Sequence, residues 1–317
     1  MNKLLLILSM IVVTAGCGSS SDSGTAGMGG AGGIGGSGGT EPKCTTPQAM
    51  LRCDKVLNIA HRGGRRIRPE HTLLAYDQAL EDGADILELD VGETSDGALV
   101  VMHDDEVDRT TDCTGLIKEM TFAEIRECDA GYEFTPDDGE TYPYRGIGLV
   151  VPTLQEVFDR YPDVAFIIEI KQESPSIVDN FVQTLRDSGV EDKMIGSQFS
   201  DDVLAELRAA APEIATNTGV NETLVFWGKA FDDLDPEYEP PAEFLQVPTQ
   251  FDVGDRIVDV LHPGFIPRAH ELDMYVHVWT INDEQEMRDL IALGVDGIMT
   301  DDPPLLTKVI NELGVGD

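Results

Sequence analysis

Short apolar runs alternate with amphipathic stretches from about residue 56 to the end of the chain. Leu57–Ala60, Ile86–Leu89 and Val164–Ile170 have the length and composition of buried strands, whereas Leu73–Leu80 and Ile177–Leu185 have helical spacing. Further strand-like runs occupy 99–102, 194–195, 214–215, 244–247, 275–280 and 297–299, and further helix-like stretches occupy 203–211, 266–272 and 287–293. About eight strands alternating with helices favour a parallel (β/α)8 TIM barrel over an open doubly wound sheet.

One segment interrupts this alternation. Residues 105–150 are rich in Asp, Gly, Pro and Tyr and contain Cys113 and Cys128. Because such composition is typical of loops, we expect an inserted cap segment after the third strand, placed above the barrel as a lid or a substrate-binding element.

The first residues have the pattern of an export signal. Lys3 precedes an apolar run from Leu4 to Val13, too short to span a bilayer comfortably, and small residues lead to Cys17. The segment 1–17 resembles a bacterial lipoprotein signal in which cleavage leaves Cys17 lipidated, although Thr14 stands where a larger aliphatic residue is usual. Ordinary secretion is the alternative, and either outcome predicts export.

The next segment, residues 18–43, is rich in Gly and Ser and predicts a tether between the lipid anchor and a domain at 44–317. We expect membrane attachment through the lipid anchor only. Because Gly18 is not the Asp that retains many lipoproteins at an inner membrane, the sequence favours the periplasmic face of an outer membrane or the cell surface.

The formal net charge of −37 restricts the partners. Such a chain repels nucleic acid and anionic lipid headgroups, so neither is expected as a general partner. A small anionic substrate would need a bound cation or a local Arg/Lys cluster at the site. Selection for solubility or a salty habitat explains the acidity equally well.

The cysteines that remain after Cys17 predict disulfides. Exported proteins keep disulfides, and four cysteines permit three connectivities. We favour Cys44–Cys53 and Cys113–Cys128, since each bridge closes a short local loop. Reduced, buried thiols are the alternative, and no spacing of cysteines indicates a zinc site.

Polar residues recur where the predicted strands end, which is where active sites of α/β barrels lie. Glu88 and Asp90 are two residues apart, so they point to the same side of a strand, and Glu169 and Lys171 share this spacing. Three inward carboxylates suit Ca²⁺ or Mg²⁺. An internal ion pair between Lys171 and a carboxylate is the structural alternative.

Two histidines end strands beside these charged residues. His61 and His103 could act as base and acid near neutral pH, while Arg62 and Lys171 could hold phosphate oxygens. The role of His71 is less defined. The remaining three histidines, His262, His270 and His277, are expected to be structural or to lie at the rim.

The ordered motifs resemble those of the glycerophosphodiester phosphodiesterase family from about residue 56 to the C-terminus. The motifs are His61-Arg62-Gly63-Gly64, Pro69-Glu70-His71-Thr72, Glu88-Leu89-Asp90, His103-Asp104 with Arg109-Thr110-Thr111 and Gly115, Glu169-Ile170-Lys171, Trp279-Thr280-Ile281-Asn282, and Val295-Asp296-Gly297-Ile298-Met299-Thr300-Asp301 with Pro303. One departure is His71, where the family usually has Asn.

The resemblance implies a function and a set of roles. The chain would hydrolyse a small-molecule glycerophosphodiester to an alcohol and sn-glycerol 3-phosphate through a cyclic phosphate formed by the neighbouring glycerol hydroxyl. The implied metal ligands are Glu88, Asp90 and Glu169, and Glu70 is a further candidate in or near this shell. His61 and His103 are the implied acid/base pair. Arg62 and Lys171 would contact phosphate, and Trp279 would form an apolar wall beside the glycerol.

Two other functions compete with this interpretation. A sphingomyelinase D-like or phospholipase phosphodiesterase would share the barrel and its two histidines, but it must seat two acyl chains, and no exposed apolar loop in the sequence suggests this. A non-catalytic, surface-anchored binding protein is disfavoured because none of the predicted histidines or carboxylates is missing.

Overall fold

The structure is a computed structural model and describes residues 44–231, 238–252 and 256–316. The predicted signal at 1–17, the lipidated Cys17 and the tether at 18–43 lie outside the described residues. Within the described ranges, no helix combines the length and apolar character needed to cross a membrane.

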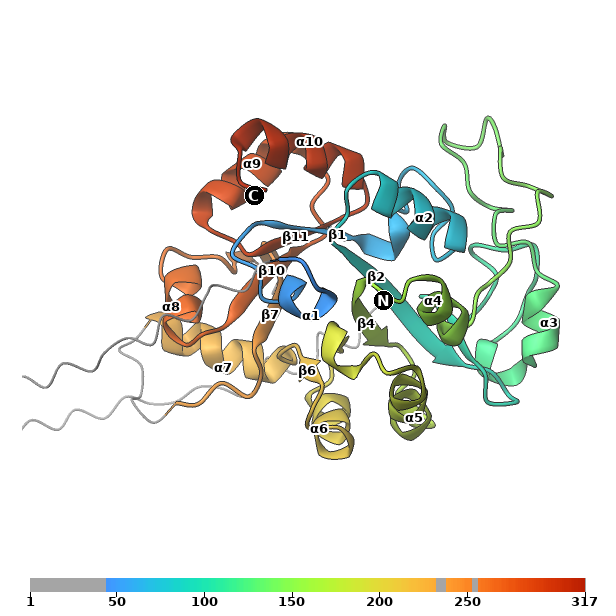
Figure 1. Cartoon of the computed structure of the whole chain (residues 1–317), viewed down its shortest axis with the longest axis horizontal. Helices are drawn as coiled ribbons and strands as arrows, with labels where there is room; N and C mark the ends of the chain where they lie inside the picture. The colour runs from blue at the N-terminus through green and yellow to red at the C-terminus, as the bar shows by residue number, and fades with distance from the viewer. Residues whose placement is uncertain (1–43, 232–237, 253–255, 317) are drawn as a thin grey trace, which may run out of the picture.

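Eight parallel strands of the described chain form a nearly closed barrel (Figure 1), which confirms the predicted (β/α)8 fold. The neighbours around the ring run β6, β5, β4, β2, β1, β11, β10 and β7, and a parallel bridge between Asn217 and Phe244 brings the two ends together. The strands are β1 (Leu57–Ala60), β2 (Ile86–Glu93), β4 (Ala165–Ile170), β5 (Met194–Ser197), β6 (Ala215–Thr216), β7 (Phe244–Pro248), β10 (Tyr275–Trp279) and β11 (Gly297–Thr300).

The third strand along the chain is not a barrel strand, contrary to the expectation from its apolar sequence. β3 (Leu99–Val101) pairs antiparallel with β2, with Val101 opposite Val91. Thr94–Ala98 connects the two strands, and Gly97 adopts a left-handed φ of 86° in this turn. Five residues are too few for the crossover that a parallel neighbour requires, so a hairpin forms instead.

Helices cover the outside of the ring. The sequence marks their starts: Thr153 and Glu156 form a capping box at the start of α4, and the Asp283 side chain accepts hydrogen bonds from the first turn of α9. The helices that follow barrel strands or pack between them are α2 (Leu73–Glu81), α4 (Leu154–Arg160), α5 (Val178–Ser188), α6 (Asp201–Ala210), α7 (Val220–Phe231), α8 (Phe265–Glu271), α9 (Glu284–Leu293) and α10 (Pro303–Leu313).

The barrel interior is apolar near the starts of the strands. Ile59, Ile86 and Ile167 belong to one buried cluster, which Leu51 also joins from the segment after α1 (Pro47–Met50). The predicted Cys44–Cys53 disulfide is present and holds this segment at the N-terminal end of the barrel. The lower end is therefore closed, and the opening lies at the carboxyl ends of the strands.

The segment 105–150 departs from the barrel after β3, in the connection between barrel strands β2 and β4. It contains a 3-10 turn at Ile117–Glu119 and the short helix α3 (Phe122–Arg126), and it shares a small buried cluster with β3. The predicted Cys113–Cys128 disulfide joins its two sides, with Cα atoms 5.6 Å apart. This segment begins two residues after His103, and its Arg109 holds Asp104, the partner of that predicted catalytic residue.

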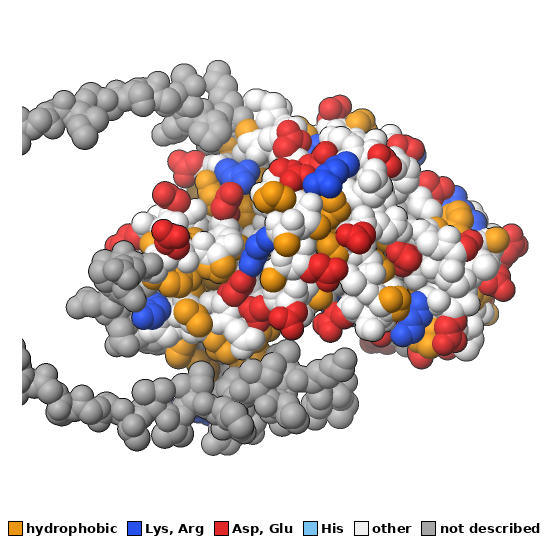
Figure 2. Space-filling model, turned by 90° about the horizontal axis from the view of Figure 1, so that it is seen from below, with side chains coloured by type: hydrophobic (Ala, Val, Ile, Leu, Met, Phe, Trp, Pro, Cys, Tyr) orange, Lys and Arg blue, Asp and Glu red, His pale blue; other side chains and the backbone are white. Residues whose placement is uncertain are grey.

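The surface is acidic, as the composition predicts. Acidic side chains are scattered over the face shown in Figure 2, with fewer basic side chains among them.

A second, two-stranded sheet pairs β8 (Gln250–Asp252) antiparallel with β9 (Ile257–Asp259) after β7.

Candidate active site

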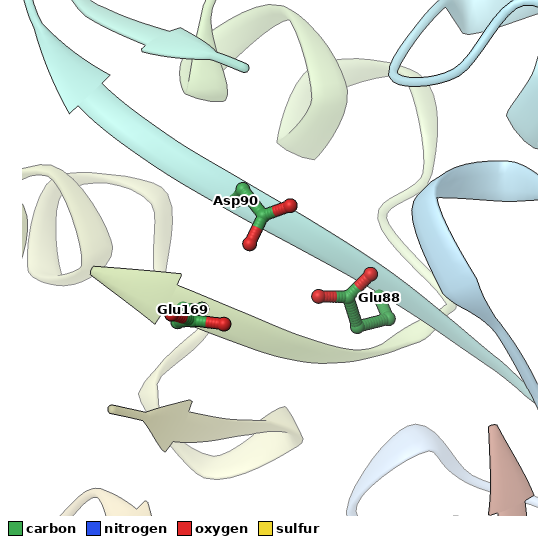
Figure 3. Close-up of side chains that lie close together, drawn as sticks. All are labelled: Glu88, Asp90 and Glu169. Carbon is green, nitrogen blue, oxygen red and sulfur yellow. The ribbon is translucent and has the colours of Figure 1, made fainter. Parts of the chain in front are cut away.

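Three carboxylates meet at the mouth of the barrel. Glu88 and Asp90 project from β2, and Glu169 projects from the neighbouring strand β4 (Figure 3). Asp90 and Glu169 are partners in the parallel register, and one oxygen from each of the three side chains lies within 4.8 Å of the others. The two-residue spacing therefore aims all three predicted ligands at one point.

The electrostatics of this cluster favour a cation. Burial raises the pKa of Glu88, as does the charge of Asp90, and burial with the same charge raises the pKa of Glu169 to about 7. Asp90 Oδ1 is buried and has no hydrogen-bond partner among the described residues. Three hard oxygen donors with one unsatisfied oxygen fit a divalent ion such as Ca²⁺ or Mg²⁺.

Arg62 lies beside the carboxylates on a tight left-handed turn. Its backbone N–H donates to Glu88 Oε2 at 2.8 Å, and its Nε lies 3.3 Å from Asp90 Oδ2. Arg62 has a φ of 52° and Gly63 a φ of 79°, and a Cβ on Gly63 would lie 2.9 Å from the Ala75 Cβ. The His-Arg-Gly sequence thus allows close packing on α2 while the arginine faces the site.

Glu70 lies outside the group of converging ligand atoms. Its carboxylate accepts from Arg62 Nη1 at 3.1 Å and from Arg109 at 2.7 and 2.9 Å. Burial would raise its pKa, but the hydrogen bonds from Arg109 and the charge of Arg62 hold it well below its usual range. In this structure Glu70 orients two arginines, and the three-residue cluster does not include it.

His103 is held by the loop that follows β3. Its Nδ1 lies 2.6 Å from Asp104 Oδ1, and Asp104 Oδ2 accepts from Arg109 Nε at 2.5 Å. Burial lowers the pKa of His103 to about 4, and the charges of Asp90 and Lys171 act on the same ring. The imidazole is therefore neutral near pH 7 and lies within electrostatic reach of the carboxylates.

His61 is oriented by a carboxylate from the last strand. Its Nδ1 lies 2.5 Å from Asp301 Oδ1, while Arg62 Nε donates to His61 Nε2 at 3.2 Å. Asn282 Nδ2 donates to the other oxygen of Asp301 at 2.9 Å. These contacts fit a tautomer in which Nδ1 donates to Asp301 and Nε2 accepts from Arg62.

The two remaining predicted substrate residues occupy different sides of the mouth. Lys171 Nζ donates to Glu169 Oε1 at 2.8 Å and lies 3.7 Å from Asp90 Oδ1, so the internal ion pair considered from the sequence does form. Trp279 ends β10 on the far side, where its ring packs edge-on against Phe199 with centroids 5.6 Å apart.

His71, the departure from the family pattern, is part of the site. It is buried, and it bridges Asp90 Oδ2 and the Tyr76 hydroxyl at 2.9 and 2.8 Å. Burial lowers the pKa of His71, so a neutral ring donates to Asp90. This contact fixes one oxygen of Asp90 and leaves Oδ1 directed to the unsatisfied position.

Four site residues escaped the sequence analysis as functional groups: Asp301, Asp104, Arg109 and Tyr76. Asp301 and Asp104 stand in the quoted motifs at strand ends, but the sequence analysis assigned them no role. Arg109 belongs to a quoted motif, but its contact with Glu70 spans 39 residues, and no local pattern marks Tyr76 on its helix.

The (β/α)8 barrel mouth combines a carboxylate cluster that could hold a cation with two carboxylate-oriented imidazoles, which are groups suited to acid–base chemistry. Residues 61–305 match the model of the glycerophosphoryl diester phosphodiesterase family, and the chain belongs to that family.

Relatives and solved structures agree with this assignment. The chain is 32% identical over 265 residues to a glycerophosphodiester phosphodiesterase of Caldanaerobacter subterraneus, covering 82% of this chain and 100% of the relative. The crystal structure of a glycerophosphodiester phosphodiesterase from Agrobacterium tumefaciens matches with a TM-score of 0.65 and 28% identity over 80% of this chain and 99% of that one. An Oleispira antarctica phosphodiesterase, solved with the product sn-glycerol-3-phosphate, matches with a TM-score of 0.62 and 26% identity over 81% and 97%.

Proposed function

We propose that this chain hydrolyses glycerophosphodiesters to an alcohol and sn-glycerol 3-phosphate, with Ca²⁺ or Mg²⁺ held by Glu88, Asp90 and Glu169. The observation that carries the proposal is the convergence of these three carboxylates beside two oriented imidazoles. A divalent ion bound there would neutralise phosphate charge and lower the pKa of a coordinated hydroxyl. Relatives that carry this activity in their names support the substrate class.

The side chains of the site supply the proton transfers. His61, held by Asp301 at Nδ1 and with Nε2 as a hydrogen-bond acceptor, is suited to remove a proton from the attacking hydroxyl. His103, held by Asp104, is the second imidazole of the acid/base pair and would serve the leaving alcohol after taking up a proton. Arg62 and Lys171 offer cationic donors to the phosphate oxygens, and Trp279 offers an apolar surface beside the glycerol.

A diester panel tests this proposal. Glycerophosphodiesters of choline, ethanolamine, inositol and glycerol are incubated with the purified chain, and sn-glycerol 3-phosphate is followed by coupled oxidation. We expect turnover that a chelator abolishes and Ca²⁺ or Mg²⁺ restores, and a loss of about 10²- to 10⁴-fold in His61→Ala and in His103→Ala. Near-normal turnover in either variant, or turnover that survives chelation, would overturn the corresponding assignment.

We also propose that the chain is exported and anchored by a lipid on Cys17, at the periplasmic face of an outer membrane or at the cell surface. The apolar run that precedes this cysteine supports the proposal. Fractionation of cells expressing the full chain and a Cys17→Ser variant tests it, because the variant should leave the membrane fraction. An equal distribution of both chains would refute lipid anchoring.

A further inference from the structure

An apolar cavity opens at the barrel mouth beside Trp279. Its volume is about 220 Å³, and it lies between the start of α7, the ends of β7 and β10, and the β8–β9 hairpin. Its apolar lining includes Phe199, Val220, Leu224, Trp227, Val258 and Trp279. Among these lining residues, the proposed phosphodiester chemistry uses only Trp279.

The cavity lies across the mouth from the carboxylates but remains connected to them. In the ring order, β7 and β10 stand opposite β2 and β4. Glu169 pairs in register with Ser197, Ser197 Oγ donates to Gln246 Oε1 at 2.8 Å, and Gln246 lines the cavity. A substrate with its phosphate at Glu169 can therefore extend past this hydrogen bond into the apolar space.

Gln246 supplies a second indication of a ligand. Its side chain is only 7% exposed, and its Nε2 has no hydrogen-bond partner among the described residues. An unsatisfied buried donor is unfavourable unless a partner arrives. At this position, between the carboxylates and the apolar lining, the partner would be an oxygen near the junction of a polar head and an apolar tail.

The apolar surface continues to the rim of the cavity. Phe199 is 43% exposed and Leu224 is 40% exposed, although both line the cavity. In a chain with a net charge of −37, exposed large apolar side chains of this kind indicate a site where the apolar part of a ligand would bind. The space is smaller than the roughly 300 to 1,000 Å³ of most small-molecule pockets, so it suits part of one alkyl chain.

We infer that the preferred substrate is a lysophospholipid, whose single acyl chain occupies this cavity while its phosphodiester lies beside Glu88, Asp90 and Glu169. The inference deepens the proposed function and rests on it. Gln246 Nε2 would donate to a glycerol or ester oxygen of the lipid. Across the reaction, the bond between phosphorus and the headgroup oxygen breaks, the oxygen of water becomes bonded to phosphorus, and one proton of water ends on the released alcohol. The products are 1-acylglycerol 3-phosphate and the free alcohol.

Chain length is the variable that tests the inference. The metal-loaded full chain is assayed with sn-glycero-3-phosphoethanolamine and with its 1-hexanoyl, 1-octanoyl and 1-decanoyl derivatives, all below their micelle concentrations, and ethanolamine release is measured. We expect kcat/KM to rise about threefold for each added methylene until the cavity is filled. A flat profile with clear turnover of the deacylated diester would overturn the inference and leave the proposed function standing.

Variants of two neighbouring residues assign the effect to the cavity. Leu224→Asp places a charge in the lining, whereas Val225→Asp changes the next residue of α7, which is 52% exposed and does not line the cavity. Leu224→Asp should lose most of the chain-length gain and keep kcat/KM for the deacylated diester within about twofold, while Val225→Asp should keep both. Leu224→Trp, which fills the space without a charge, should shorten the preferred chain.

The remaining outcomes are also decisive. A chain-length gain that is unchanged in Leu224→Asp and Leu224→Trp would remove the cavity from the explanation and overturn the assignment. A dimer that dissociates in Leu224→Asp, without any chain-length gain, would show that a second copy covers the apolar lining. Absence of turnover with every diester would refute the proposed function itself, and the inference with it.

Discussion

The two sides of the barrel mouth differ in the kind of group that they can bind. On the β1, β2 and β4 side, buried charges of both signs converge around Asp90, and almost every polar atom has a partner. On the β6, β7 and β10 side, the lining is mainly apolar, with Gln246 among its few polar groups. The comparison teaches that one scaffold can hold the reacting phosphate on one side and leave the other side free for substrate selection.

Neutralising Asp90 should have the largest effect, because it breaks the charged side at its centre. Asp90→Asn removes one ligand and the charge that acts on Glu88 and Glu169. We expect kcat/KM to fall by at least about 10³-fold and calorimetric metal binding to disappear. Glu81→Gln, the same type of change at an exposed position of α2, is the control and should retain both. Normal metal affinity in Asp90→Asn would contradict the proposed metal site.

Removing the charge of Asp301 should have a smaller effect, because this residue acts through His61. Asp301→Asn keeps the size of the side chain but weakens the contact with His61 Nδ1. We expect kcat to fall about 10- to 100-fold with little change in KM, a changed pH profile, and partial rescue in Asp301→Glu. Metal affinity should stay near that of the unaltered chain. A variant that loses metal binding together with activity would instead indicate general damage to the mouth.

The smallest expected effect concerns stability and lies on the apolar side. His277 on β10 is fully buried, neither ring nitrogen has a hydrogen-bond partner among the described residues, and burial lowers its pKa to about 4. The unfolded chain, with a pKa near 6.5, binds more protons between these two values. The contribution of the neutral His277 to the free energy of unfolding is therefore fully present above about pH 6.5. It is lost as the pH drops towards 4, by about 3 kcal/mol.

The variant His277→Leu tests this expectation by denaturant unfolding across that pH range. The free energy of unfolding should fall less steeply in the variant than in the unaltered chain. His270→Gln, which replaces a partly exposed imidazole on α8, is the control and should keep the steep fall. Identical slopes in His277→Leu and the unaltered chain would mean that another group governs acid stability.

The sequence predicted the barrel because hydrophobic periodicity is local, and it predicted the carboxylates because two-residue spacing fixes the side to which a strand residue points. It failed at Leu99–Val101, where an apolar run looked like a barrel strand. The turn at Asp96-Gly97 carried the missing signal, since the short connection allows only a hairpin. The length of a connection should therefore be weighed together with the composition of the strand.

Long-range partners were beyond the reach of pattern analysis. Glu70 looked like a possible metal ligand from its motif, yet its oxygens face Arg62 and Arg109, the latter 39 residues away. The apolar cavity is similar, because residues from Phe199 to Trp279 meet only when the barrel closes. Such groups depend on how elements pack, and no local spacing encodes that packing.

The Cys113–Cys128 bridge has a consequence for the loop that carries the partners of His103. Cys113 lies only four residues after Arg109, which donates hydrogen bonds to Asp104 and Glu70. The bridge therefore ties down the segment that follows His103. A newly made chain with free thiols would lack this covalent tie, so its catalytic loop would be less constrained. The bridge would therefore limit the movement of the loop that carries Asp104 and Arg109.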